Sequence, residues 1–188
     1  MDRITIIMDV ICQNLQRSRG AAKLGSNESP QRILAALVRL LALENPQNFP
    51  GGTEQLRQYL HLAVANALRL VSASTMLFTC LQLLRSNDLP LQIELYTLLG
   101  NCLSDVNAEA RSQMSSDVVL LAKIVKDNLA TTQSTELSIA AMKALQAVTR
   151  TARPAELSAL TETVPIVTNN LQTPQLSDHG IQTLHMLW

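Results

Sequence analysis

The sequence has few aromatic residues: Phe, Tyr and Trp together make up 3% of its 188 residues, and glycine occurs only six times. Strands favour aromatic and β-branched side chains, so this scarcity argues against a β-sheet fold. Leucine, in contrast, occurs 33 times and alanine 20 times, which favours helices. With 47% apolar residues the chain can bury a substantial core. We therefore expect an all-α protein.

The sequence also lacks a long apolar run, and its first residues do not resemble a secretory leader. Its best apolar stretch, residues 33–43, is interrupted by Arg39, whereas a membrane-spanning helix needs about 18 apolar residues. Acidic residues flank the first apolar stretch, and no small-residue cleavage site follows it. The three cysteines are widely spaced among leucines, which favours reduced, packed thiols. They are Cys12, Cys80 and Cys102. We expect a soluble intracellular protein of the cytoplasm or nucleus.

The chain has no net charge, since 15 basic residues balance 15 acidic ones, and this excludes a polycation. The balance is uneven along the chain. Residues 1–85 hold nine basic and five acidic side chains, and residues 86–188 hold six and ten. One cluster of basic residues could form a patch for an acidic peptide or a phosphate backbone, or could simply be solvated helix faces. Its members are Arg17, Arg19, Lys23, Arg32 and Arg39.

Motifs for catalysis or metal binding are missing from the sequence. It contains no GxxxxGK[ST], GxGxxG, GxSxG, HExxH or CxxC pattern. His179 and His185 are six residues apart, which places them on opposite sides of a helix rather than on one metal-binding face. We expect no enzymatic activity, cofactor, metal, membrane or small-molecule substrate, and we expect a protein partner instead. Binding of nucleic acid by the basic N-terminal half stays an alternative.

Helical periodicity runs nearly from end to end of the chain. Ser29 with Pro30, and Thr173 with Pro174, indicate helix starts, because proline is tolerated at the first helical position. Residues 45–52, NPQNFPGG, form the one long connection. The predicted helices lie near 2–18, 30–44, 54–72, 74–86, 90–104, 107–115, 117–130, 135–151, 155–163, 165–171 and 175–187.

The second half of the chain repeats itself. A shift of 42 residues places Ile124 on Ile166 and Ile139 on Ile181, and a shift of 46 places Ile93 on Ile139. Such similarity at a fixed period is typical of repeat proteins, in which each unit buries an apolar stripe against its neighbour. The predicted stripes are Ile93, Tyr96, Leu99 and Cys102; Ile139, Met142 and Leu145; and Ile181, Leu184 and Leu187. Chance alignment within a compact helical adaptor or oligomerisation bundle is the other reading.

Two stretches resemble the armadillo repeat, with its short first helix, second helix and long third helix. They are NAEARSQMS, SDVVLLAKIVKDNL and TELSIAAMKALQAV, followed by PAELSALTE, VPIVTNNL and SDHGIQTLHML. QIELYTLLGNCL is similar to a third helix and carries Leu99, Gly100 and Asn101 where the family has its groove-side pattern. The resemblance implies a right-handed α-solenoid of about four armadillo/HEAT-like repeats. It also implies that the third helices line a concave surface for an extended peptide or a partner helix.

On this resemblance we expect one helical domain over residues 1–188, with 1–72 as atypical N-terminal hairpins and 74–104, 105–151 and 154–188 as successive repeats. Within the importin-like branch only Asn101 matches the groove asparagines, and no tryptophan ladder accompanies it, so binding of nuclear signals is not implied.

The candidate partner-binding residues come from three observations. Asn101 comes from the resemblance. Lys143, Gln146 and Arg150 share one polar face, which we expect to lie opposite Ile139, Met142 and Leu145. The apolar register of the last helix continues to the final residue, so we expect a segment of a longer protein or a partner that covers this end, with a frayed natural C-terminus as the alternative. The full set is Asn101, Lys143, Gln146, Arg150, His185 and Trp188.

Overall fold

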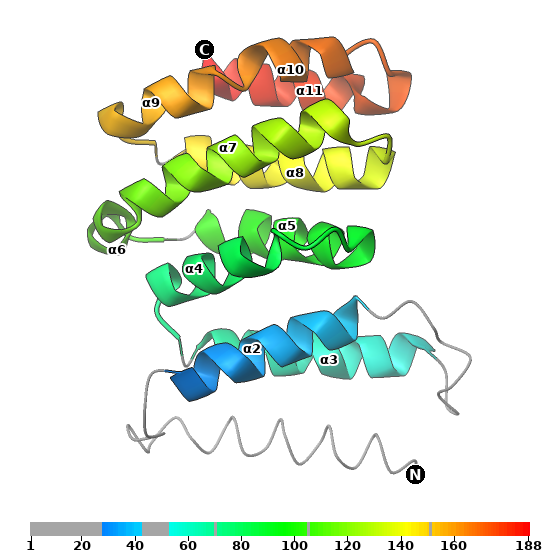
Figure 1. Cartoon of the computed structure of the whole chain (residues 1–188), viewed down its shortest axis with the longest axis vertical. Coiled ribbons are helices and arrows are strands. Elements are labelled where there is room, and N and C mark those ends of the chain that lie inside the picture. Colours follow the sequence, from blue (N-terminus) through cyan, green and yellow to red (C-terminus); the bar gives the residue numbers. More distant parts are fainter. Residues whose placement is uncertain (1–27, 43–52, 70, 105, 151) are drawn as a thin grey trace. The chain divides into compact units, whose positions relative to one another are not determined.

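The structure, a computed structural model, describes residues 28–42, 53–69, 71–104, 106–150 and 152–188. Within these ranges it consists of helices and contains no strand, which confirms the predicted all-α class (Figure 1). The contacts divide the chain into two compact units, Met1–Thr79 and Cys80–Trp188. The helices are α2 (Glu28–Leu41), α3 (Thr53–Leu68), α4 (Ala73–Leu83), α5 (Leu89–Leu103), α6 (Ala108–Gln113), α7 (Ser115–Thr131), α8 (Thr135–Thr149), α9 (Pro154–Thr161), α10 (Val164–Asn170) and α11 (Pro174–Leu187).

The helix boundaries follow local sequence signals at most starts. Thr173 is the N-cap of α11 and Pro174 its first residue, as predicted. The predicted start at Ser29 was wrong, because α2 already begins at Glu28 and Pro30 lies within the first turn, where its missing N–H is tolerated. The helix predicted for 54–72 ends early, at Leu68. The predicted helix 2–18 and connection 45–52 lie outside the described residues.

In the first unit, α2 and α3 pack against each other. Both helices bury residues spaced three or four apart, so each presents one apolar stripe to the other. The buried residues are Leu34, Leu37, Val38 and Leu41 on α2, and Leu60, Ala63, Val64 and Ala67 on α3. Helix α4 carries the boundary between the two units, which falls between Thr79 and Cys80.

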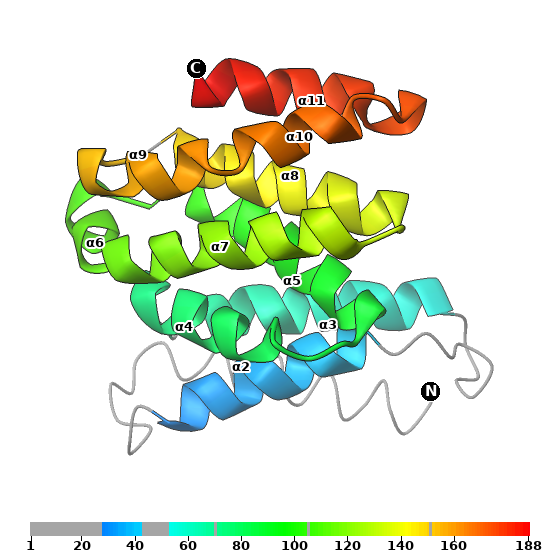
Figure 2. The same cartoon turned by 45° about the horizontal axis from the view of Figure 1, so that its top comes forward.

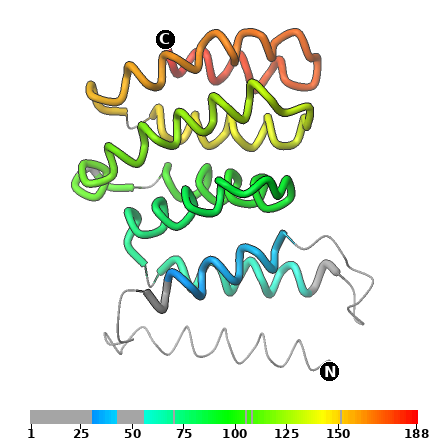
Figure 3. Tube along the Cα trace, viewed as in Figure 1, coloured from blue at the N-terminus to red at the C-terminus, as the bar shows by residue number. Residues whose placement is uncertain are grey.

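The second unit has two layers of helices. Helices α5, α8 and α11 run in the same direction, with α8 packed against both α5 and α11 (Figures 1 and 2). Helices α7 and α10 run the opposite way and pack against α8 and α11, respectively. The short α6 and α9 precede α7 and α10 in the chain, as the trace in Figure 3 shows. The sets α6–α7–α8 and α9–α10–α11 therefore pair their second and third helices in corresponding ways.

The core of this unit is densest at α8. Its neighbours on several sides leave Met142 and Leu145 fully buried, as predicted. Tyr96 and Leu99 of α5 are also fully buried. These large side chains fill the space between helices, and each excludes apolar surface from water.

The predicted buried stripe on α11 was wrong. Ile181 is 59% exposed, and the residues that α11 buries are Leu176, Gly180 and Thr183. Helix α8 has α5 on one side and α11 on the other. Among the described helices, α11 packs against α8 and α10, and Ile181 faces outward. The same 42-residue register places Gly180 and Thr183 on Ser138 and Ala141, which α8 also buries, so the error lies in assigning Ile181 to the buried face.

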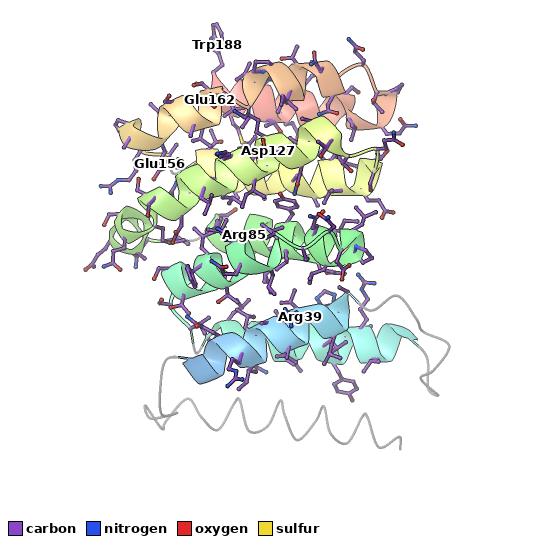
Figure 4. The ribbon with its side chains drawn as sticks, in the orientation of Figure 1. Arg39, Arg85, Asp127, Glu156, Glu162 and Trp188 are labelled. Carbon is purple, nitrogen blue, oxygen red and sulfur yellow. The ribbon has the colours of Figure 1, made fainter. Side chains whose placement is uncertain are left out.

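A buried ion pair joins α6 to α9. The Arg111 guanidinium donates to both carboxylate oxygens of Glu156, with Nη1–Oε1 2.9 Å and Nη2–Oε2 2.5 Å. The two side chains are 4% and 0% exposed. Oxygen Oε2 also accepts the backbone N–H of Arg153 at 3.1 Å, which caps α9. Figure 4 labels Glu156 on α9. Because the Glu156 carboxylate both pairs with Arg111 and caps the helix, it fixes the geometry of the chain at the start of α9.

A second polar contact joins α5 to α7. The side chain of Asn128 donates from Nδ2 to the hydroxyl of Tyr96 at 2.7 Å. Burial raises the pKa of Tyr96 above its usual value of 10.0, and the hydrogen bond from Asn128 opposes this effect. The hydroxyl therefore stays neutral, and its hydrogen bond with Asn128 connects α7 to α5.

Candidate protein-binding groove

A groove with a volume of about 620 Å³ lies between α5 and α8. We call it the α5/α8 groove. Its rim consists of exposed residues and its floor of small, buried ones. The lining from α5 is Ile93, Thr97, Gly100, Asn101 and, just beyond the helix, Ser104. The lining from α8 is Glu136, Ile139, Ala140, Lys143, Gln146, Ala147 and, at its C-cap, Arg150. The groove is thus formed by two parallel neighbours of one layer.

Local interactions set the position of both helices. At the start of α5 the Asp88 carboxylate accepts the Leu91 N–H at 3.2 Å. Gln92 donates from Nε2 to the carbonyl oxygens of Leu84, at 3.3 Å, and Ser86, at 2.8 Å. At the start of α8 the Ser134 hydroxyl accepts the Leu137 N–H at 3.2 Å. These contacts satisfy donors and acceptors at the helix ends and hold the groove walls in place.

Gly100 permits close approach of the two walls. A Cβ at this position would lie 3.5 Å from the backbone nitrogen of Ala144 and 3.5 Å from the carbonyl carbon of Lys143. These are ordinary van der Waals distances, so an alanine would fit but a larger side chain would press on the backbone of α8. The small side chains of Ala140 and Ala147 continue the same floor along α8. Backbone therefore comes near the surface at the centre of the groove.

One face of α8 supplies its wall of the groove. Ile139, Lys143, Gln146 and Arg150 follow one another at steps of four, three and four residues, which places them on a single side of a helix. The prediction that Ile139 lies opposite Lys143 was therefore wrong, and Ile139 lines the groove half-buried. A spacing of four residues already places Ile139 and Lys143 on one face of a helix.

The groove has unequal charge at its two ends. Lys143 and Arg150 are exposed, and neither side chain has a hydrogen-bond or ion-pair partner in the part of the chain that the structure describes. Glu136 lies at the opposite end of α8, also exposed. At 1.5 Å of rise per residue, Glu136 and Arg150 are about 21 Å apart along the helix axis. Arg150 thus lies at one end of the rim, Glu136 at the other, and Lys143 midway between them.

Four of the six residues predicted to bind a partner come together in this groove: Asn101, Lys143, Gln146 and Arg150. The other two do not. His185 lies exposed on α11, and Trp188, which follows that helix, is fully exposed and projects away from the ribbon (Figure 4). Neither lines the α5/α8 groove.

Gln146 differs from the prediction in its exposure. The sequence places it on one polar face with Lys143 and Arg150, but this side chain is only 8% exposed. Its Nε2 donates to the Thr183 hydroxyl at 2.9 Å and to the His179 carbonyl at 3.3 Å, both on α11. Gln146 therefore connects α8 to α11. The exposed polar groups of the groove are the amide of Asn101 and the cations of Lys143 and Arg150.

The predicted basic patch is only partly described. Arg32 and Arg39 lie exposed on α2. Arg17, Arg19 and Lys23 lie outside the described residues.

The described residues contain no group of three or more His, Cys, Asp or Glu side chains able to hold a metal ion. Cys80 is a buried free thiol, and Cys102 is half-buried. Burial raises the pKa of the Cys80 thiol from 9.0 to about 12. None of the described helices has the length and apolar character needed to cross a membrane.

Comparisons with known proteins give one structural likeness. The sequence matches no known protein-family profile and no curated protein. Its fold is similar to the crystal structure of an engineered protein from the Northeast Structural Genomics Consortium. The match covers 96% of this chain and 75% of that one, with 17% sequence identity and a TM-score of 0.54. A likeness at this identity supports the helical fold and carries no information on function.

Proposed function

We propose that the protein is a non-catalytic interaction scaffold that binds a segment of another protein in the α5/α8 groove. We further propose that α6–α8 and α9–α11 are successive armadillo/HEAT-like repeats of a right-handed α-solenoid, in which α5, α8 and α11 are the third helices. The matching order of helices and the matching pairs α7 with α8 and α10 with α11 support this reading. The 42-residue sequence period supports it independently.

The observation that carries the proposed function is the chemistry of the groove lining. It combines half-buried apolar residues, such as Ile93 and Ile139, with a small number of unpaired polar groups at the rim, such as Asn101 and Lys143. Apolar surface provides affinity and isolated polar groups provide orientation, which is the usual composition of a recognition site. The rigid walls lower the entropy cost of binding, because α8 is packed on several sides.

A binding role suits this lining better than catalysis does. Among the described residues that line the groove, the only carboxylate is Glu136, and histidine, cysteine and tyrosine do not occur. Covalent or acid–base chemistry needs a nucleophile or base with a second group that orients it. We also infer an intracellular location, supported by the buried free thiol of Cys80.

The experiment that tests the function is affinity capture with a blocked groove. Thr97 is exposed on the groove wall, so Thr97→Trp would fill the groove without disturbing the core. Ser116→Trp, at an exposed position of α7, is the matched control. The wild-type chain and both variants would be used to capture proteins from an extract of the source cells, followed by mass spectrometry.

We expect at least one protein that the wild type and Ser116→Trp retain and Thr97→Trp does not. Equal melting temperatures of the three chains would show that the loss is local. If the same proteins bind to all three chains, the groove is not the binding surface.

A further inference from the structure

The ligand of the α5/α8 groove can be narrowed by its dimensions. Its two walls approach each other closely at the floor, because a Cβ on Gly100 would lie 3.5 Å from the backbone nitrogen of Ala144. An α-helix with its side chains is about 10–12 Å across, whereas a single extended chain is narrower. The narrow floor lined by Gly100, Ala140 and Ala147 therefore favours an extended chain over a helix.

The charges of the groove rim indicate which side chains the ligand carries. Lys143 and Arg150 are both exposed, lack partners within the described residues and belong to the same rim. They are seven residues apart on α8, so their backbone positions are separated by about 10 Å along the axis. An extended polyproline-type chain rises about 3.1 Å per residue and returns to the same side every third residue. Two acidic side chains three residues apart would therefore be about 9 Å apart and face both cations.

We propose that the α5/α8 groove binds an extended acidic peptide, in which two carboxylates three residues apart pair with Lys143 and Arg150. The backbone of the peptide then passes over the small floor residues Gly100, Ala140 and Ala147. The end of the peptide near Glu136 is neutral or basic, because an acidic residue there would face a carboxylate. This inference rests on the proposed function and specifies the chemistry of its ligand.

The test uses synthetic probes rather than the natural partner. A fluorescein-labelled peptide, Ala-Pro-Glu-Ala-Pro-Glu-Ala-Pro, carries the proposed spacing in an extended conformation. Its counterparts replace both Glu by Gln or by Lys, and a fourth probe holds two Glu residues on one face of a stapled helix. Binding to the full chain is measured by fluorescence anisotropy at low and moderate salt.

We expect the extended Glu peptide to bind at least about tenfold more tightly than the Gln, Lys and helical probes, since two charge-assisted contacts are lost or misplaced. The variant Lys143→Glu/Arg150→Glu should lose this preference. Arg32→Glu/Arg39→Glu has the same charge change at exposed positions of α2 and should retain it. If the double Glu variant does not fold, Lys143→Gln/Arg150→Gln takes its place.

Three results would overturn the inference. The first is equal binding of the Glu and Gln peptides, and the second is tighter binding of the helical probe. The third is a loss of binding caused by the α2 variant rather than the groove variant. These failures differ from a failure of the proposed function. A protein partner lost on Thr97→Trp but retained by Lys143→Glu/Arg150→Glu would leave the groove as a binding site and refute only the acidic ligand.

Discussion

The buried pair of Arg111 and Glu156 allows a quantitative test of how α6 and α9 are joined. Replacing Glu156 with leucine leaves a guanidinium that is almost wholly buried without its carboxylate. It also removes the acceptor of the Arg153 N–H. We expect Glu156→Leu to lower the free energy of unfolding by about 3–5 kcal/mol, the usual cost of removing one partner of a buried ion pair.

The double variant gives the decisive comparison. In Arg111→Met/Glu156→Leu apolar side chains of similar length replace both charged partners of the pair. Such replacements are often neutral, and we expect a change within about 1 kcal/mol of the wild type. The double variant should therefore be more stable than Glu156→Leu alone. If Arg111 and Glu156 contributed independently to stability, the second substitution would not restore it.

The assay is urea unfolding followed by far-ultraviolet circular dichroism, with the slope of each transition compared between variants. The matched control is the exposed pair of Lys126 and Glu162, whose Nζ–Oε2 distance is 2.7 Å. Removing one or both of these partners should give no measurable coupling, because solvent screens the charges. If Glu156→Leu costs less than about 1 kcal/mol, or if the double variant is the least stable, the buried pair does not join α6 to α9 as described.

Three further predictions concern the core of the second unit. Leu145→Ala removes a side chain that is 1% exposed and should destabilise the fold by about 2–5 kcal/mol in the same assay; a change below about 0.5 kcal/mol would contradict its burial. Tyr96→Phe removes the hydroxyl that accepts from Asn128 and should cost about 1–2 kcal/mol. Because the pKa of Tyr96 is raised in the folded state, wild-type stability should fall as pH rises above about 10, and Tyr96→Phe should reduce that slope; an unchanged slope would contradict the assignment. Iodoacetamide at neutral pH should label Cys102 and spare Cys80, whose pKa of about 12 leaves almost no thiolate, as peptide mapping would show; equal labelling would contradict the burial of Cys80.

The helices could be predicted from the sequence because their signals are local. Thr173 and Pro174 mark the start of α11, and the Leu- and Ala-rich periodicity marks the helices themselves. The ends were predicted less well, as for α3, because apolar residues continue beyond Leu68 without a glycine to stop the helix.

The groove was predicted in part for the same reason. Lys143 and Arg150 are seven residues apart, so helical geometry alone places them on one face. Asn101, on the neighbouring helix, was identified through the similarity of that helix to the third helix of an armadillo repeat. The burial of Gln146 could not be predicted, since its partner Thr183 comes from another helix, 37 residues away. The pair of Arg111 and Glu156 is separated by 45 residues and likewise depends on tertiary packing.

The role of the α5/α8 groove is tested most directly by nuclear magnetic resonance of the isotopically labelled chain, titrated with the segment of the captured partner that it binds. Our account predicts that the backbone amides whose resonances shift most belong to Leu89–Leu103 and Thr135–Thr149, with Thr97 and Lys143 among the largest changes. Shifts concentrated instead on Glu28–Leu41 or on Pro154–Thr161, with α5 and α8 unaffected, would contradict it.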